Sequence, residues 1–189
     1  MPTDLPKLPP RERILAAADE LFYRDGIRGV GVEAIAAHAG TTKMGIYRHF
    51  ANKDALVAEW LRLESQAYSD VLDRLKAQYP EDPKAQLLGW AQFIASRLAV
   101  EADRGCCFAN SVAELPDRAH PAWSVIEAHS RDLSERLIDL CTQAGLAEPE
   151  NVANEIIFVL DGAQLAAQSR GDAQKVGERL VSIVRRLVQ

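Results

Sequence analysis

Cysteine is scarce in this chain, and the common motifs that bind metals or nucleotides are missing. Only three of the 189 residues are cysteine, and two of them, Cys106 and Cys107, are adjacent. So few cysteines do not form a disulfide framework. The sequence also has no CxxC, no HExxH and no glycine-rich phosphate loop. We therefore expect neither a bound metal nor a cofactor.

Long apolar runs are absent as well. The longest stretch without a charged residue covers the 12 residues from Ala85 to Ser96. A membrane-spanning helix needs about 20 apolar residues. The N-terminus also lacks the apolar core of a signal peptide. The sequence therefore predicts a soluble protein of the cytoplasm.

Apolar residues recur with the period of an α-helix along almost the whole chain. Hydrophobic residues make up 48% of it and charged residues 26%, as in ordinary globular proteins. Glycines and prolines interrupt the helical pattern, and no β-branched or aromatic run is bounded by hairpin signals. The pattern predicts an all-α fold of about nine helices, preceded by a mobile, proline-rich arm over residues 1–10.

Charge is unevenly distributed along the chain. Residues 1–53 contain 8 Lys/Arg and 6 Asp/Glu, a net charge of +2. Residues 54–189 contain 14 and 21, a net charge of −7. A basic segment on an acidic body indicates a polyanion contact at one end, with chance clustering as the alternative.

Residues 33–50 have the pattern of a helix-turn-helix. A first helix ends at Gly40, a tight turn follows, and Thr42 is a good N-cap for a second, short helix. Such a helix fits the major groove of DNA, and its free N–H groups attract phosphate. Lys43 and Lys53 add cations at two helix starts, where the helix dipole is already positive and an anion is favoured.

Four segments resemble the DNA-binding domain of the tetracycline-repressor (TetR) family. They are GIRGVGV at residues 26–32, EAIAAHAG at 33–40, TTKMGIYRHF at 41–50, and Asn52-Lys53 followed by Leu56. They occur in order and at family spacing, and the match covers about residues 11–60. The resemblance implies a homodimeric transcriptional regulator, most often a repressor that a small, largely apolar ligand releases from a palindromic operator. It implies a three-helix DNA-binding domain over residues 11–52 and a ligand-binding and dimerisation domain over residues 53–189.

The resemblance also implies roles for individual residues at the DNA. The implied DNA-binding residues are Thr42, Lys43, Met44, Gly45, Tyr47, His49, Lys53 and Glu33. Lys43 and Met44 match positions that face base edges. Tyr47, His49 and Lys53 match phosphate contacts.

Two residues depart from the family pattern. Glu33 is acidic at a position that contacts DNA in some members, where a carboxylate is unfavourable beside phosphate but can accept from a cytosine amino group. Gly31 replaces a Ser or Thr cap that many members have. These departures weaken the expected contacts of the first helix of the motif.

Aromatic and polar residues of the later helices predict a ligand pocket, because cavities between bundle helices commonly bind small apolar molecules. The predicted pocket residues are Trp60, Trp90, Phe93, Phe108, Asn110, Trp123, His129, Phe158 and Gln164. The alternative for each is that it fills the core.

The last two predicted helices combine small residues with an apolar stripe, which favours close helix packing. The predicted dimer residues are Ala163, Ala167, Leu180, Ile183, Val184 and Leu187. Two such helices from each subunit would form a four-helix bundle. Packing within a single chain is the alternative.

Other functions compete with a ligand-released repressor. Cys106 or Cys107 could sense electrophiles or oxidants, since Arg104 nearby would favour a thiolate, although free cysteine often simply packs. An all-helical small-molecule-binding protein without DNA binding is a further alternative. An enzyme would have to be built on these cysteines with His129 and Asp132. No motif defines such a site, so we expect no enzymatic activity.

Overall fold

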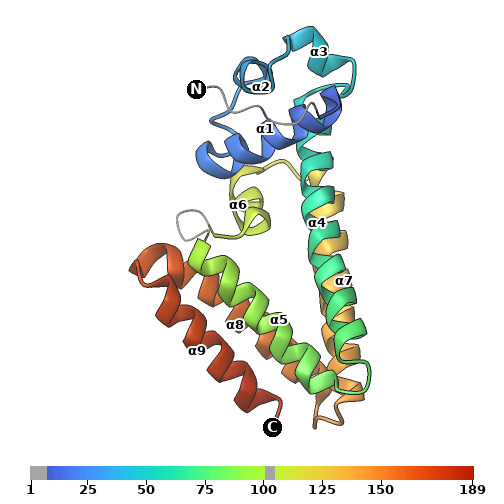
Figure 1. Cartoon of the computed structure of the whole chain (residues 1–189), viewed down its shortest axis with the longest axis vertical. Helices are drawn as coiled ribbons and strands as arrows, with labels where there is room; N and C mark the ends of the chain where they lie inside the picture. The colour runs from blue at the N-terminus through green and yellow to red at the C-terminus, as the bar shows by residue number, and fades with distance from the viewer. Residues whose placement is uncertain (1–7, 101–104) are drawn as a thin grey trace. The chain divides into compact units, whose positions relative to one another are not determined.

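The computed structural model describes residues 8–100 and 105–189, and all regular structure within them is helical (Figure 1). The helices are α1 (Pro10–Asp25), α2 (Val32–His38), α3 (Lys43–Tyr47), α4 (Lys53–Gln78), α5 (Pro83–Val100), α6 (Cys107–Glu114), α7 (Ala122–Gln143), α8 (Pro149–Arg170) and α9 (Ala173–Leu187). The predicted all-α class is confirmed. Of the predicted arm, residues 1–7 lie outside the described residues, and Pro10 already belongs to α1. No helix in the described part of the chain is long and apolar enough to cross a membrane.

Several helix ends follow the capping residues that the sequence contains. The Asn52 side chain accepts a hydrogen bond from the Ala55 N–H at 2.8 Å, at the start of α4. Asp172 accepts one from the Lys175 N–H at 3.2 Å and opens α9. These short-range bonds satisfy N–H groups that a helix start leaves without a partner.

The chain divides into two compact units. The first contains the chain up to Glu64 together with Cys107–Ile126, and the second contains Ser65–Cys106 together with Glu127–Gln189. Helices α4 and α7 therefore contribute to both units. The sequence instead predicts a division by role, with DNA binding up to residue 52 and ligand binding and dimerisation from residue 53. That division stays a prediction.

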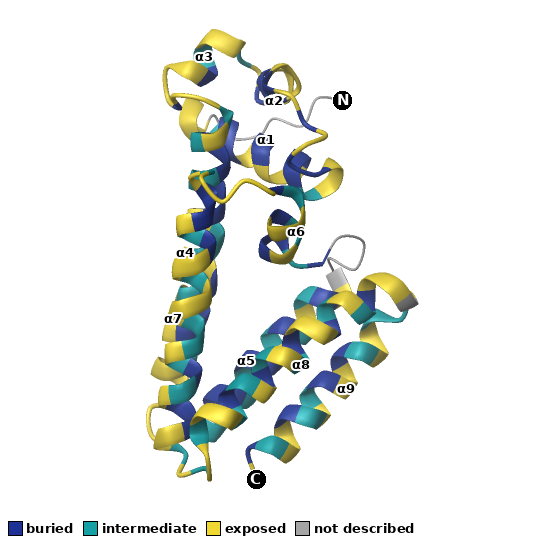
Figure 2. Cartoon of the chain, turned by 180° about the vertical axis from the view of Figure 1, so that it is seen from behind, coloured by how far each residue is buried: buried dark blue, intermediate teal, exposed yellow. Residues whose placement is uncertain are grey.

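The first unit has a core of aliphatic and aromatic side chains from α1 to α4. Ile14, Ile35 and Ile46 are fully buried in it. The Trp60 ring lies 5.3 Å from the ring of Phe22, and its indole N–H donates to Asp19 at 2.8 Å. This packing holds α2 and α3 against α1 and α4, and the helices of this unit have buried faces in Figure 2.

The second unit contains α5, α8 and α9, which pack together, and paired segments of α4 and α7 (Figure 1). Gly177 allows α9 to approach α5 closely, because a Cβ at this position would lie 3.0 Å from the Cβ of Ala95. Leu180 and Val184 of α9 are buried in the same packing. Small residues at a helix crossing thus let the apolar faces meet.

Candidate DNA-binding surface

The turn between α2 and α3 is held by short-range hydrogen bonds. Gly40 adopts a left-handed conformation with φ of 62°, which suits a residue without a Cβ. The Thr41 N–H donates to the carbonyl of Ala36 at 2.9 Å. The Thr42 hydroxyl accepts from the Gly45 N–H at 3.1 Å, which confirms Thr42 as the N-cap of α3.

Helix α3 buries one face and exposes the rest. Ile46 is fully buried and Phe50 is 6% exposed, so both anchor the helix to the unit beneath. Met44 is 67% exposed and Tyr47 is 39% exposed. Lys43, Thr42 and His49 are also exposed, and Gly45 is half-buried. The predicted residues between Thr42 and His49 are thus exposed or half-buried, and α3 is largely coloured as exposed in Figure 2.

Lys43 forms an ion pair with Glu33 across the helix-turn-helix. The Lys43 Nζ lies 2.6 Å from the Glu33 Oε1, and both side chains are largely exposed. The hydrogen bond from Lys43 lowers the pKa of the Glu33 carboxyl, and the backbone of Glu33 lowers it further. The same pair raises the pKa of Lys43. Both groups are therefore charged at neutral pH.

Lys53 has a different position from the one the sequence predicts. Its Nζ donates to the carbonyl of Ile27 at 2.6 Å, and the side chain is part-buried. Burial lowers the pKa of Lys53, and the nearby carboxylates of Asp54 and Glu114 oppose this effect. The phosphate contact implied for Lys53 therefore stays a prediction, and in this geometry its ammonium group supports the fold. The side chain ties the start of α4 to the α1–α2 turn, whose Arg28 N–H also donates to Glu114 at 2.9 Å.

Arg48 was missed in the sequence prediction, although the signal for it was present. Its side chain is exposed directly after α3 and has no hydrogen-bond or ion-pair partner among the described residues. It follows Met44 by four residues, one helical turn, which places both on the same side. Arg48 is thus a further exposed cation beside α3.

Comparison with known proteins agrees with this geometry. Residues 14–60 match the family model described as "Bacterial regulatory proteins, tetR family". A putative TetR transcriptional regulator from Streptomyces avermitilis, sav143, is 30% identical, with 94% of this chain and 98% of that chain covered and a TM-score of 0.77. The chain belongs to the TetR family.

Two further relatives support the assignment over almost the whole length. The TetR-family regulator SCO4454 from Streptomyces coelicolor is 29% identical, with a TM-score of 0.89, and the match covers 95% of this chain and 94% of that one. The nicotine-responsive transcriptional repressor HdnoR of Paenarthrobacter nicotinovorans is 24% identical over 162 residues, 82% of this chain and 81% of its own. TetR-family regulators bind DNA, typically as dimers, and are generally not enzymes. The protein is a transcriptional regulator of this family.

The predicted ligand residues of this TetR-family chain are divided between the two units. Trp60, Phe108, Asn110 and Trp123 belong to the first unit, whereas Trp90, Phe93, His129, Phe158 and Gln164 belong to the second. Trp60 and Trp123 are core residues, and the indole N–H of Trp123 donates to the carbonyl of Leu115 at 3.1 Å. Phe158 is 73% exposed on α8, so its assignment to a pocket within the chain is wrong. The helical period alone did not show which face of α8 is covered.

The second unit contains an aromatic cluster beside a small cavity. The ring of Tyr68 lies 5.7 Å from that of Trp90, 5.8 Å from that of Phe93 and 5.4 Å from that of His129. The cavity, of about 10 Å³, is lined by Tyr68, Ile94, Arg97, Leu98, Gly105, Cys106 and Gln164. Among the described residues, the Trp90 indole N–H and the Gln164 amide oxygen are buried without a hydrogen-bond partner, and Gln164 lines the cavity.

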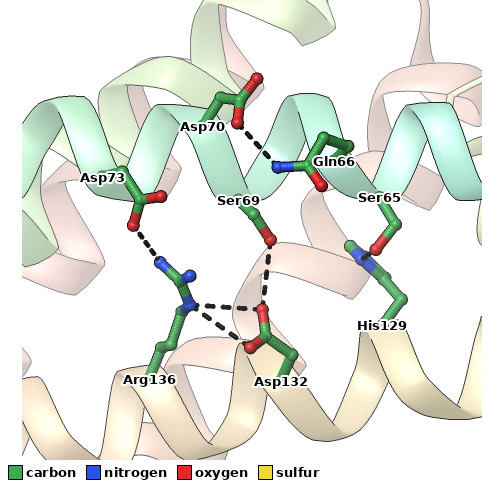
Figure 3. A network of polar contacts seen from close by, with 8 residues as sticks. All are labelled: Ser65, Gln66, Ser69, Asp70, Asp73, His129, Asp132 and Arg136. Atoms are coloured by element: carbon green, nitrogen blue, oxygen red, sulfur yellow. Dashed lines mark hydrogen bonds and ion pairs between the residues drawn. The ribbon is translucent and has the colours of Figure 1, made fainter.

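Polar side chains connect α4 and α7 next to this cluster (Figure 3). Ser65 and His129 lie 3.1 Å apart between the hydroxyl and the Nδ1, and Ser69 donates to Asp132 at 3.2 Å. Arg136 bridges Asp132 and Asp73, at 3.3 Å and 2.7 Å. Burial lowers the pKa of His129 to about 4, so the imidazole is neutral at neutral pH.

The predicted dimer residues divide into buried and accessible ones. Ala163, Ala167, Leu180 and Val184 are at most 8% exposed within a single chain. Ala163 and Leu180 still line a groove at the surface, so the contact of these residues with a partner stays a prediction. Ile183 and Leu187 are half-buried. A surface groove of about 790 Å³ lies between α8 and α9, and Ile183 lines it.

The three cysteines differ in access. Cys106 is half-buried and lines the cavity, whereas Cys107 and Cys141 are buried. Burial raises the pKa of Cys141 to about 11, which keeps it a thiol. Arg104, which the thiolate hypothesis invokes, lies outside the described residues.

Proposed function

We propose that the protein is a homodimeric repressor of the cytoplasm, without enzymatic activity, that a small and largely apolar ligand releases from a palindromic operator. The observation that carries the proposal is the open face of α3. Met44, Tyr47 and Arg48 are exposed on a helix that Ile46 and Phe50 anchor from below. Exposed apolar and basic side chains on a short helix suit the major groove.

Each residue of the surface has a proposed role at the DNA. Thr42 and Gly45 shape the N-terminus of α3 against the groove, and Lys43 and Met44 face base edges. Tyr47, Arg48 and His49 donate to phosphate oxygens. Phosphate contacts orient such a domain, whereas base contacts carry the sequence information.

A second copy of the chain is proposed to cover the outer face of α8. Phe158 is 73% and Leu165 is 66% exposed, and the two are separated by two helical turns. The groove between α8 and α9 continues this apolar face. Pairing places two copies of α3 about 34 Å apart, or a multiple of that distance, on the operator.

The effector is proposed to enter beside Tyr68, where the cavity now has room for about one water molecule. A small, mainly apolar molecule with one donor would satisfy the buried amide oxygen of Gln164, which lines this cavity. The nicotine-responsive relative supports a small organic effector. Binding would tilt α4, which contributes to both units, and change the spacing of the two α3 helices. Equal half-site spacing in free and effector-bound structures would contradict this mechanism.

A second candidate function is thiol sensing through Cys106, which is half-buried and lines the cavity. It predicts that a soluble electrophile such as N-ethylmaleimide releases the protein from DNA and that Cys106→Ser abolishes the release. Under the ligand-released mechanism, the Cys106→Ser variant still responds to its effector.

The proposal is tested by selecting binding sites for the purified protein from random duplex DNA at two salt concentrations. An enriched palindrome with salt-sensitive affinity is the expected result, because each phosphate contact releases counterions. A folded, dimeric protein that enriches no sequence would instead support a ligand-binding protein without DNA binding.

A further inference from the structure

We propose that Glu33 is a specificity-determining residue. It neutralises Lys43 beside the recognition helix and so weakens binding to DNA of unrelated sequence. This inference rests on the proposed placement of α3 against DNA. A carboxylate at this surface repels phosphate, and the proposed role of Glu33 depends on that repulsion.

The two side chains come from different helices of the helix-turn-helix. Glu33 lies in the first turn of α2, and Lys43 is the first residue of α3. The turn between the helices brings the Lys43 Nζ to 2.6 Å from the Glu33 Oε1. The Glu33 side chain is 69% exposed and that of Lys43 is 53% exposed. The pair is thus part of the surface that would meet DNA.

Such an exposed ion pair contributes little to folding stability. The effect of the pair on DNA binding is different, because it depends on the net charge at the surface and not on the strength of the ion pair. A free lysine at the surface binds a phosphate and releases a condensed counterion. A lysine beside a carboxylate brings no net charge, and the carboxylate repels the phosphate.

One carboxylate is a large share of the charge at this surface. The exposed cations of the helix-turn-helix and its preceding turn are Arg28, Lys43 and Arg48, and Glu33 reduces their net charge from +3 to +2. Removing Glu33 would therefore raise the net charge of the proposed contact surface by half. Binding to unrelated DNA is almost entirely electrostatic, so it is the most sensitive to this change.

Operator binding depends less on the same charge. In the proposed operator complex Lys43 faces base edges, where its ammonium group donates to a base acceptor such as guanine O6 or N7. Without Glu33, Lys43 would gain phosphate contacts on unrelated DNA. It would gain fewer on the operator, where its ammonium group already contacts a base. Glu33 thus increases the ratio of operator affinity to affinity for unrelated DNA.

The test is a charge cycle on the full-length protein, with variants E33Q, K43Q and E33Q/K43Q. Binding to a random-sequence duplex and to the selected operator is measured by fluorescence anisotropy from 50 to 200 mM salt. On random DNA, E33Q is expected to steepen the slope of log affinity against log salt concentration by about 0.9 per subunit. Affinity then falls by a further factor of about 3.5 per subunit between 50 and 200 mM salt. K43Q weakens binding and flattens the salt dependence, and the double variant returns to the wild-type slope.

Two controls separate this effect from folding and from overall charge. E33D keeps the carboxylate, and it is expected to keep the wild-type slope. E81Q makes the same charge change at an exposed residue of the second unit, and it should leave the slope unchanged. Thermal unfolding of E33Q is compared with that of wild type.

The outcomes distinguish the inference from the proposed function. If wild type binds operator DNA but E33Q has the wild-type slope on random DNA, the role of Glu33 is overturned and the proposed function is not. It is also overturned if E33Q loses operator affinity while its affinity for random DNA is unchanged, since Glu33 would then be a base contact. A wild-type protein that binds no duplex DNA would overturn the proposed function together with the inference.

Discussion

Lys53 and Arg48 carry the same charge five residues apart, yet their surroundings give them different roles. The ammonium group of Lys53 donates to the Ile27 carbonyl and is part-buried. The guanidinium group of Arg48 is exposed and has no partner among the described residues. At the scale of single residues, access to solvent thus decides whether a cation supports the fold or is available to DNA.

Lys53→Met is expected to lower the free energy of unfolding by about 1–3 kcal/mol, because it removes a charge-assisted hydrogen bond and leaves the Ile27 carbonyl without its partner. Urea unfolding measures this change. The salt dependence of DNA binding should stay at the wild-type value. A flatter salt dependence of DNA binding with an unchanged free energy of unfolding would show that Lys53 contacts phosphate.

Arg48→Gln is expected to have the opposite result. The salt dependence of DNA binding should become shallower by about 0.9 per subunit, since one phosphate contact is lost. The free energy of unfolding should change by less than about 0.5 kcal/mol, as for other exposed substitutions. Anisotropy titrations at several salt concentrations, together with urea unfolding, check both parts. A wild-type salt dependence in this variant would exclude Arg48 from the phosphate contacts.

At the scale of helices, α3 is short and depends on its cap. It has five residues, and the Thr42 hydroxyl satisfies one of its first N–H groups. Thr42→Ala is expected to destabilise the protein by about 1 kcal/mol, measured by urea unfolding, and Thr42→Ser should preserve stability. Equal stability of the Ala and Ser variants would show that the cap has no role in holding α3.

The contact between α4 and α7 gives the protein a pH-dependent stability. Burial lowers the pKa of His129 to about 4 from its ordinary value near 6.5. Between these values the unfolded chain binds a proton that the folded chain does not, so stability falls as the pH decreases from about 6.5 to about 4. Urea unfolding of His129→Asn across this range should show a weaker pH dependence than wild type. As a matched control, His49→Asn at an exposed position should have the pH dependence of the wild-type protein.

At the scale of the whole molecule, the exposed outer face of α8 is the proposed contact with a second copy of the chain. Phe158→Asp or Leu165→Asp is expected to convert the dimer to a monomer, because an unpaired carboxylate is costly to bury in an interface. Light scattering after size-exclusion chromatography measures the mass, and operator affinity should fall with it. Val112→Asp, an exposed residue of α6, is the matched control and should remain dimeric. A dimeric Phe158→Asp variant would move the interface elsewhere.

The sequence alone determined what depends on neighbours within one or two helical turns. The apolar period predicted helices, and Thr42 marked where α3 begins. Asn52 and Asp172 cap α4 and α9 through hydrogen bonds of the same short range. The order and spacing of the helix-turn-helix segments identified the family. These features follow from short-range hydrogen bonds and from the periodicity of one buried face, and both can be read along the chain.

Only the tertiary structure decided which distant groups meet. Lys53 reaches the carbonyl of Ile27, 26 residues away, and Lys43 meets Glu33 across the turn. Trp60 packs in the first unit instead of lining a pocket, and Phe158 is exposed on α8. A helical pattern shows that a side chain is apolar or charged, but not which face a neighbouring helix covers. That choice depends on packing between elements far apart in the sequence, and it determines which residues remain free for DNA, a ligand or a second subunit.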